Sequence, residues 1–152
     1  MQGNDYCSIF FAIMNIDIPM KLNPRFDHVG IAVDSIESSS KFYRDIGLSS
    51  GDSEIVQNQG VEVLFLHSGE THIELLQPIN QESAVAKFLR RRGPGLHHIA
   101  FQVDDVLKAT EHCVSSGYIA IDKTPRIGAG GYMIAFLHPK STGGVLIELI
   151  QK

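Results

Sequence analysis

The chain has 152 residues, of which 43% are hydrophobic and 20% charged, as in globular proteins and unlike disordered, fibrous or membrane ones. Its formal net charge of -4 disfavours a nucleic-acid binder, because such domains usually carry a basic face. We therefore expect a small-molecule partner, with neither a nucleic acid nor a membrane involved. Cys7 and Cys113 lack the spacing of a metal knuckle or a disulfide scaffold, so we expect two packing thiols in a cytoplasmic protein.

The first 25 residues differ from the rest of the chain. Their apolar stretch, residues 9–13, is too short to span a bilayer, and no basic residue precedes it as in a secretory signal. We expect residues 1–25 to form an extension that either adds a strand or is loosely attached. A single domain then covers residues 26–152.

The chain repeats itself at a constant offset of 70 residues. Residues 28–48, HVGIAVDSIESSSKFYRDIGL, align with residues 98–118, HIAFQVDDVLKATEHCVSSGY. In each copy an apolar strand runs into an aspartate suited to capping (Asp34 or Asp104), then a helix, then a glycine that can end it (Gly47 or Gly117). Each copy is therefore predicted to begin as strand, helix and turn.

The repeat continues downstream, where residues 63–77 match residues 134–151 if the second turn is longer. Both segments read as two apolar strands joined by a polar turn. The pattern predicts two β-α-β-β-type modules, about residues 26–78 and 96–152, with a linking helix at about residues 82–92. One fused domain follows, because a module of this size buries too little apolar surface alone.

Strand parity assigns different roles to the two adjacent histidines of GLHHIAF. His98 shares a face with Ala100, as His28 shares one with Gly30 and Ala32, and these small residues leave space above the sheet. His97 falls on the opposite, bulkier face. We expect His98 to be a ligand and His97 to pack beside it.

Two glutamates complete a candidate metal site. Glu74 and Glu148 lie inside the apolar runs HIELL and LIELI, where an unpaired buried carboxylate is costly. Each residue alone is compatible with a solvated strand position, but all four candidates form two repeat-related pairs. A divalent cation accepts imidazole and carboxylate ligands together. The predicted ligands are His28, Glu74, His98 and Glu148.

From about Phe26 to Lys152 the chain resembles the vicinal oxygen chelate (glyoxalase-like) superfamily. Within it, the stretches FDHVGIAV, ESAVAKFLRRRGPGLHHIAFQVDD and IGAGGYMIAFLHPKSTGGVLIEL are most similar to the methylmalonyl-CoA epimerases. The resemblance implies an α+β fold of two β-α-β-β-β modules, whose curved eight-stranded sheet surrounds a metal-binding cleft. It also implies a homodimer and one divalent ion, with cobalt first and manganese, nickel, zinc or magnesium as alternatives.

The resemblance implies that the four predicted ligands match metal-coordinating positions, and that the substrate is an acyl-CoA thioester. The implied reaction interconverts (2R)- and (2S)-methylmalonyl-CoA by proton abstraction, with the metal stabilising the enolate. Glu148 is the first candidate base as well as a ligand. Some epimerases carry the second proton carrier at the position of Val63, so Glu62, one residue earlier, and Glu74 are the candidates here.

Two alternative functions stay open. Some epimerases use glutamine at the position of Glu74, whereas glyoxalase I uses glutamate, so a lactoylglutathione lyase acting on the methylglyoxal-glutathione hemithioacetal is one alternative. A non-catalytic small-molecule-binding protein of the same fold is the other.

Candidate substrate contacts come from two basic segments. Arg90 begins a run of three arginines that either binds the phosphates of coenzyme A or forms a solvated helix end. Lys140 and Ser141 belong to the LHPKSTGG turn, the stretch that is most specific to the epimerases.

Overall fold

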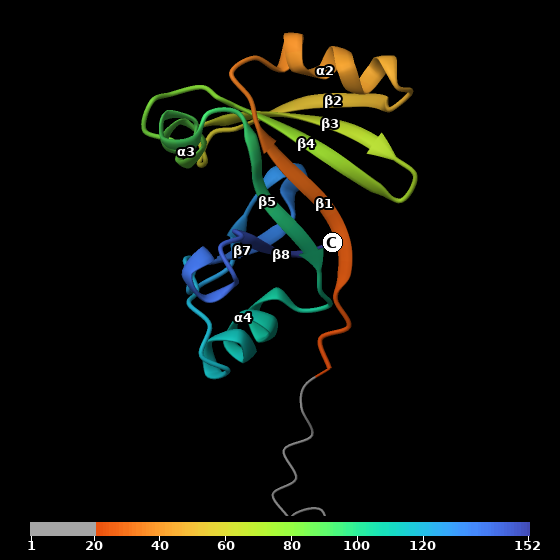
Figure 1. The fold of residues 1–152 in the computed structure, drawn as a ribbon. Helices are drawn as coiled ribbons and strands as arrows, with labels where there is room; N and C mark the ends of the chain where they lie inside the picture. Colours follow the sequence, from red (N-terminus) through yellow and green to blue (C-terminus); the bar gives the residue numbers. More distant parts are fainter. Residues whose placement is uncertain (1–20) are drawn as a thin grey trace, which may run out of the picture.

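The structure is a computed structural model that describes residues 21–152, so Cys7 and most of the predicted extension lie outside the described residues. Eight strands and three α-helices form in the described part (Figure 1). They are β1 (Arg25–Ala32), α2 (Ile36–Asp45), β2 (Ser49–Val56), β3 (Val61–Ser68), β4 (Thr71–Pro78), α3 (Ala84–Arg92), β5 (Gly95–Gln102), α4 (Val106–Ser115), β6 (Arg126–Ile127), β7 (Met133–Leu137) and β8 (Ile147–Gln151).

All eight strands belong to one sheet, in the order β2-β3-β4-β1-β5-β8-β7-β6. The two modules join at the centre, where β1 and β5 run antiparallel, and each first strand pairs in parallel with the last strand of its own module. Figure 1 shows α2 over β2, β3 and β4, and α4 beside the β7–β8 half. This arrangement confirms the predicted α+β fold with a curved eight-stranded sheet.

Local capping sets the helix boundaries. Ser35 and Asp105 are the N-caps of α2 and α4, one residue after the predicted aspartates. Their side chains accept hydrogen bonds from the backbone amides of Ser38 and Lys108, three residues further along the chain. The linking helix α3 begins at residue 84, two residues later than predicted, because Ser83 is its N-cap and accepts from the Ala86 amide at 3.0 Å. Gly47 and Gly117 follow α2 and α4 with positive φ angles, as predicted.

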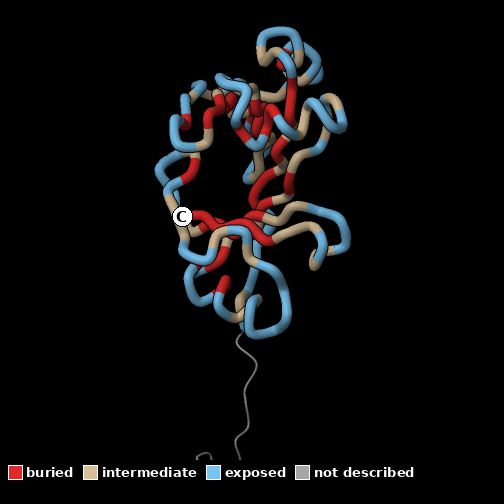
Figure 2. The backbone as a smooth tube through the Cα atoms, turned by 90° about the vertical axis from the view of Figure 1, so that its left-hand side faces the viewer, coloured by how far each residue is buried: buried red, intermediate tan, exposed pale blue. Residues whose placement is uncertain are grey.

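The apolar core lies on both faces of the sheet. On the helix side, α4 packs over Val103, Ala135 and Leu149, and Cys113 of this helix contacts the same cluster. On the other face, buried valines of β3 and apolar residues of β5, β7 and β8 line the interior of the curve. Figure 2 shows the buried segments following the strands, with the turns exposed at the rim. None of the helices within residues 21–152 has the length and apolarity needed to cross a membrane.

Candidate metal centre

The repeat places two histidines against each other at the middle of the sheet. His28 of β1 lies opposite Ala100 of β5, and His98 of β5 lies opposite Gly30 of β1. The Nε2 atoms of the two rings are 3.1 Å apart, and the residues are only 1% and 5% exposed. A Cβ atom on Gly30 would lie 2.1 Å from the His98 ring, so a glycine is needed for this close approach.

The two glutamates approach the same point from opposite sides of the central strand pair. Glu74 of β4 pairs with Gly30, and Glu148 of β8 pairs with Ala100. His28 Nε2 lies 3.5 Å from a carboxylate oxygen of each glutamate, and His98 Nε2 lies 2.9 Å from Glu148 Oε2. Both glutamates are buried. The structure therefore brings the four predicted ligands together.

These separations suit a shared divalent ion. Two ligand atoms about 2.1 Å from one ion and at right angles to each other lie about 3.0 Å apart. The Nε2 and Oε2 atoms of His28, His98 and Glu148 lie 2.9–3.5 Å apart, and these residues form one of the two clusters within residues 21–152 that could hold a metal. Two imidazoles and two carboxylates fit a borderline or hard divalent cation.

Opposite charges balance in the centre. Burial lowers the pKa of His28, but hydrogen bonds to Asp27 and Glu148 and the charge of Glu74 outweigh burial and raise it to about 10. Burial raises the pKa of Glu148, but hydrogen bonds from His28 and His98 bring it down to about 2. Glu148 thus stays ionised and favours positive charge at this point, which a divalent cation supplies.

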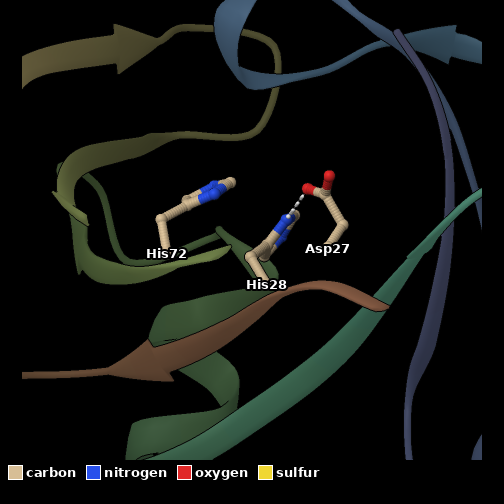
Figure 3. Close-up of side chains that lie close together, drawn as sticks. All are labelled: Asp27, His28 and His72. Carbon is tan, nitrogen blue, oxygen red and sulfur yellow. Dashed lines mark hydrogen bonds and ion pairs between the residues drawn. The ribbon is translucent and has the colours of Figure 1, made fainter. Parts of the chain in front are cut away.

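A backbone irregularity adds Asp27, which the sequence analysis missed. The β1–β5 register shifts between Phe26 and His28, and the Asp27 side chain lies beside the His28 ring (Figure 3). His28 Nδ1 donates to Asp27 Oδ2 at 2.7 Å, and Lys152 Nζ donates to Asp27 Oδ1 at 2.7 Å. This pairing orients the ring so that Nε2 faces the other ligands. Strict alternation along β1 would place Asp27 on the opposite face from His28.

His72 is a second residue that the sequence analysis missed. It lies opposite His28 across the parallel β1–β4 pair, and the two rings face each other with centroids 4.8 Å apart (Figure 3). Its Nε2 is 3.2 Å from Glu74 Oε1, so it holds one oxygen of that carboxylate. Its parity with Glu74, two residues along one strand, was the signal available in the sequence.

His97 lies beside the centre. Its Nδ1 is 3.0 Å from His98 Nδ1, and its ring packs edge-on against Phe88 of α3. Burial, followed by the nearby His98, lowers the pKa of His97 to about 4. A neutral His97 therefore supports the His98 ring from the side away from Glu148.

A cavity of about 390 Å³ opens onto the centre, within the range of about 300–1,000 Å³ typical of small-molecule sites. Glu74, His98 and Glu148 line it, together with Val63 and His97. The prediction that His97 faces away from His98 was wrong, because the β1–β5 register shifts between Gly30 and Ile31 and leaves His97 outside the regular pairing. Glu62 does not line the cavity, because alternation on β3 directs its side chain to the other face of the sheet. Of the two candidate second proton carriers, Glu74 alone reaches this cavity.

The three predicted substrate contacts lie outside this cavity. Arg90 is exposed and donates to the carbonyl and side-chain oxygens of Gln81. Lys140 is exposed, and Ser141 Oγ accepts from the Ile119 amide and donates to the His138 carbonyl. The Ser141 side chain is therefore engaged in holding its own turn.

Comparisons with known proteins agree with this geometry. The family described as Glyoxalase/Bleomycin resistance protein/Dioxygenase superfamily matches residues 27–136. The uncharacterized protein YqjC of Bacillus subtilis is 41% identical over 84% of this chain and 91% of its own length. The mitochondrial methylmalonyl-CoA epimerase of Mus musculus is 38% identical over 84% of this chain and 72% of its own.

A solved structure shows the same likeness in three dimensions. It is described as methylmalonyl-CoA epimerase in complex with methylmalonyl-CoA and NH4+, and is 36% identical with a TM-score of 0.81. The match covers 85% of this chain and 94% of that one. The chain therefore belongs to the glyoxalase/bleomycin resistance protein/dioxygenase superfamily, in which its relatives include methylmalonyl-CoA epimerases.

Proposed function

We propose that the chain is a metal-dependent methylmalonyl-CoA epimerase, which interconverts the (2R) and (2S) forms of its substrate. The observation that carries the proposal is the convergence of two histidines and two carboxylates at a cavity, in a chain with epimerase relatives. The protein is accordingly an isomerase. Its substrate is an acyl-CoA thioester.

The cofactor in this proposal is one divalent cation, with cobalt first and manganese, nickel, zinc or magnesium as alternatives. His28, Glu74, His98 and Glu148 would hold it. A divalent ion in that place supplies Lewis-acid stabilisation of the negative charge that develops when C2 of the substrate loses its proton. Asp27 and His72 orient two of the ligands through hydrogen bonds at 2.7 and 3.2 Å.

Epimerisation needs a proton removed from one face of C2 and one returned to the other. Glu148 and Glu74 line the cavity from the two sides of the β1–β5 pair, so they are suited to opposite faces of one carbon. We assign proton removal to Glu148 and proton return to Glu74, with the roles exchanged in the reverse direction. Glu62 lies outside the cavity and is not assigned a step.

A lactoylglutathione lyase is the second candidate function. Glu74 favours it, because a carboxylate stands where some epimerases have glutamine and where glyoxalase I has glutamate. Both reactions move a proton at a carbon next to a carbonyl or thioester, so the same ligands serve either. The substrate distinguishes them.

The experiment offers both substrates to the cobalt-loaded protein. We expect deuterium from solvent at C2 of methylmalonyl-CoA and no conversion of the hemithioacetal of methylglyoxal and glutathione. The reverse pattern would establish the lyase. Binding of either compound without turnover would favour a non-catalytic binding protein. His98→Ala serves as the inactive control, since it removes one ligand.

The family resemblance also implies a homodimer, and we propose this state in the cytoplasm. Light scattering on the purified protein gives the mass of the particle in solution. A mass equal to one chain would contradict the dimer.

A further inference from the structure

The two ends of the curled sheet meet beside the cavity without forming a strand pair. β2 and β6 are the edge strands, and within residues 21–152 no ladder of backbone hydrogen bonds joins them. Residues 129–131, the tip of the hairpin formed by β6 and β7, contact β2 instead. Asn58, Arg126 and Ala129 line the cavity at this join. The cavity is therefore closed on this side by a hairpin tip rather than by a continuous sheet.

Two hydrogen bonds and one apolar contact hold the hairpin tip to the first module. The Gly130 amide donates to Glu54 Oε2 at 2.7 Å, and Asn58 Nδ2 donates to the Ile127 carbonyl at 3.0 Å. Ala129 packs against the buried cluster that contains the β3 valines. None of the ion pairs within residues 21–152 involves Glu54, so no charged partner competes with the Gly130 amide for its carboxylate.

The base of the hairpin is anchored within the second module. Arg126 pairs with Ile134 of β7, and its Nε donates to Asp122 Oδ1 at 3.0 Å. Its guanidinium carbon lies 5.5 Å from the centre of the Phe136 ring. None of these contacts involves the first module, so release of the tip leaves the base of the hairpin in place.

The hairpin tip has the features of a segment that opens easily. Gly130 and Gly131 are exposed and have φ angles of 68° and 75°, a left-handed conformation that glycine adopts without strain. Both hydrogen bonds to the first module lie at the surface. Segments with few buried contacts and exposed hydrogen bonds open at a small cost in free energy. Movement of Ala129 away from β3 uncovers the cavity.

We propose that residues 129–131 form a gate, which opens to let an acyl-CoA thioester enter and leave the cavity and closes around its acyl group. Glu54 is a positioning residue, because it holds the gate closed through the Gly130 amide and is not itself part of the cavity lining. The choice of thioester rests on the proposed function, whereas the gate rests on the contacts of Glu54, Asn58 and Ala129. Closure excludes water from the carbon that loses its proton, which protects the enolate from stray protonation.

Four variants of the cobalt-loaded protein test the gate. Glu54→Ala removes the acceptor, and Glu54→Gln retains a neutral acceptor oxygen. Gly131→Ala strains the closed tip through its φ angle of 75°. Gly69→Ala is the matched control, because Gly69 has a φ angle of 63° in the turn between β3 and β4, away from the cavity. A Cβ atom at either glycine meets no non-neighbouring atom within 4 Å, so neither substitution adds a clash.

Three measurements are made on each variant. Hydrogen exchange of the peptide covering residues 127–132 reports how often the tip opens without substrate. Stopped-flow mixing with the equilibrium mixture of the (2R) and (2S) epimers reports association and dissociation through the absorbance of bound cobalt, and epimerisation causes no net change in this mixture. Calorimetric titration gives the cobalt affinity as a check on the metal centre.

We expect Glu54→Ala and Gly131→Ala to exchange at least about fivefold faster in this peptide, because one loses a hydrogen bond to a charged group and the other adds left-handed strain. Association and dissociation rates should rise by the same factor, with the dissociation constant within about twofold of the wild type, since both directions pass through the open gate. Glu54→Gln should lie between Glu54→Ala and the wild type. Gly69→Ala should match the wild type throughout, and all four variants should keep the wild-type cobalt affinity.

Three results would overturn the proposal: unchanged exchange in Glu54→Ala, faster exchange without faster association, or equal effects in Gly69→Ala. The first shows that Glu54 does not hold the tip, and the second shows that the substrate enters elsewhere. Failure of the proposed function gives a different result. In that case the wild type gives no cobalt signal with methylmalonyl-CoA, while hydrogen exchange still decides whether Glu54 holds the tip.

Discussion

The substitution Gly30→Ala tests how the sheet makes room for the His98 ring at the metal centre. A Cβ atom at this position would lie 2.1, 2.4 and 2.7 Å from three atoms of the His98 ring, whereas ordinary contacts begin at 3.4 Å. The ring cannot simply move aside, because the rings of His28, His97 and Phe136 pack edge-on around it. Gly30→Ala must therefore displace a predicted ligand or distort the β1–β5 pair.

The expected loss of stability in Gly30→Ala follows from overpacking of the interior. An added methyl group in a well-packed interior costs about 1–3 kcal/mol of unfolding free energy. Changes that disturb the support of a ligand lower metal affinity by about 10–100-fold, and a displaced ligand should cost at least this much. Urea unfolding of the cation-free protein measures the first quantity, and calorimetric titration with cobalt measures the second.

Gly51→Ala is the matched control. Its Cβ atom would lie 2.8 Å from the end of the His67 ring, but His67 is exposed and can turn away. Cobalt affinity should therefore stay at the wild-type value. In a His98→Ala background, Gly30→Ala should cost less than about 0.5 kcal/mol, since the clashing ring is gone. A full cost in that background, or unchanged cobalt affinity in Gly30→Ala alone, would show that the clash with the His98 ring does not limit this position.

Three further predictions concern neighbouring side chains. His98→Ala should abolish cobalt binding in a calorimetric titration, whereas His97→Ala should retain it; equal losses would contradict the separate roles of the two histidines. Asp27→Ala should weaken cobalt affinity by about 10–100-fold through loss of ring orientation, and an unchanged affinity would exclude that role. The pKa of Glu148, at about 2, lies below its ordinary 4.5, so its stabilising contribution is present above pH 4.5 and is lost as pH falls towards 2. In urea unfolding of the cation-free protein, the stability difference between wild type and Glu148→Gln should shrink over that interval; a constant difference would contradict the assignment.

The internal sequence repeat was the basis for predicting most of the fold and all four ligands. Because the two copies pair through β1 and β5, equivalent positions must meet at the centre of the sheet, and strand parity then places His28 and His98 on the face of the metal centre. Glu74 and Glu148 enter from the flanking parallel strands for the same reason. Symmetry in the sequence thus predicted proximity in space.

Features that break regular alternation could not be predicted this way. The register shift at Asp27 brings the side chains of two consecutive residues together. The residue-by-residue pairing of β1 with β5 that causes this shift has no signature in one sequence. The run of three arginines was equally ambiguous, and only the structure shows that Arg90 contacts Gln81 outside the cavity.

Metal-dependent epimerisation is tested most directly by deuterium exchange at C2 of methylmalonyl-CoA in heavy water, followed by mass spectrometry. The protein is first stripped with a chelator and then reloaded with cobalt. We expect exchange at the buffer rate after stripping, acceleration after reloading, and no acceleration for reloaded His98→Ala. Undiminished exchange by the stripped protein, or none by the reloaded wild type, would contradict a metal-dependent epimerase built on these four ligands.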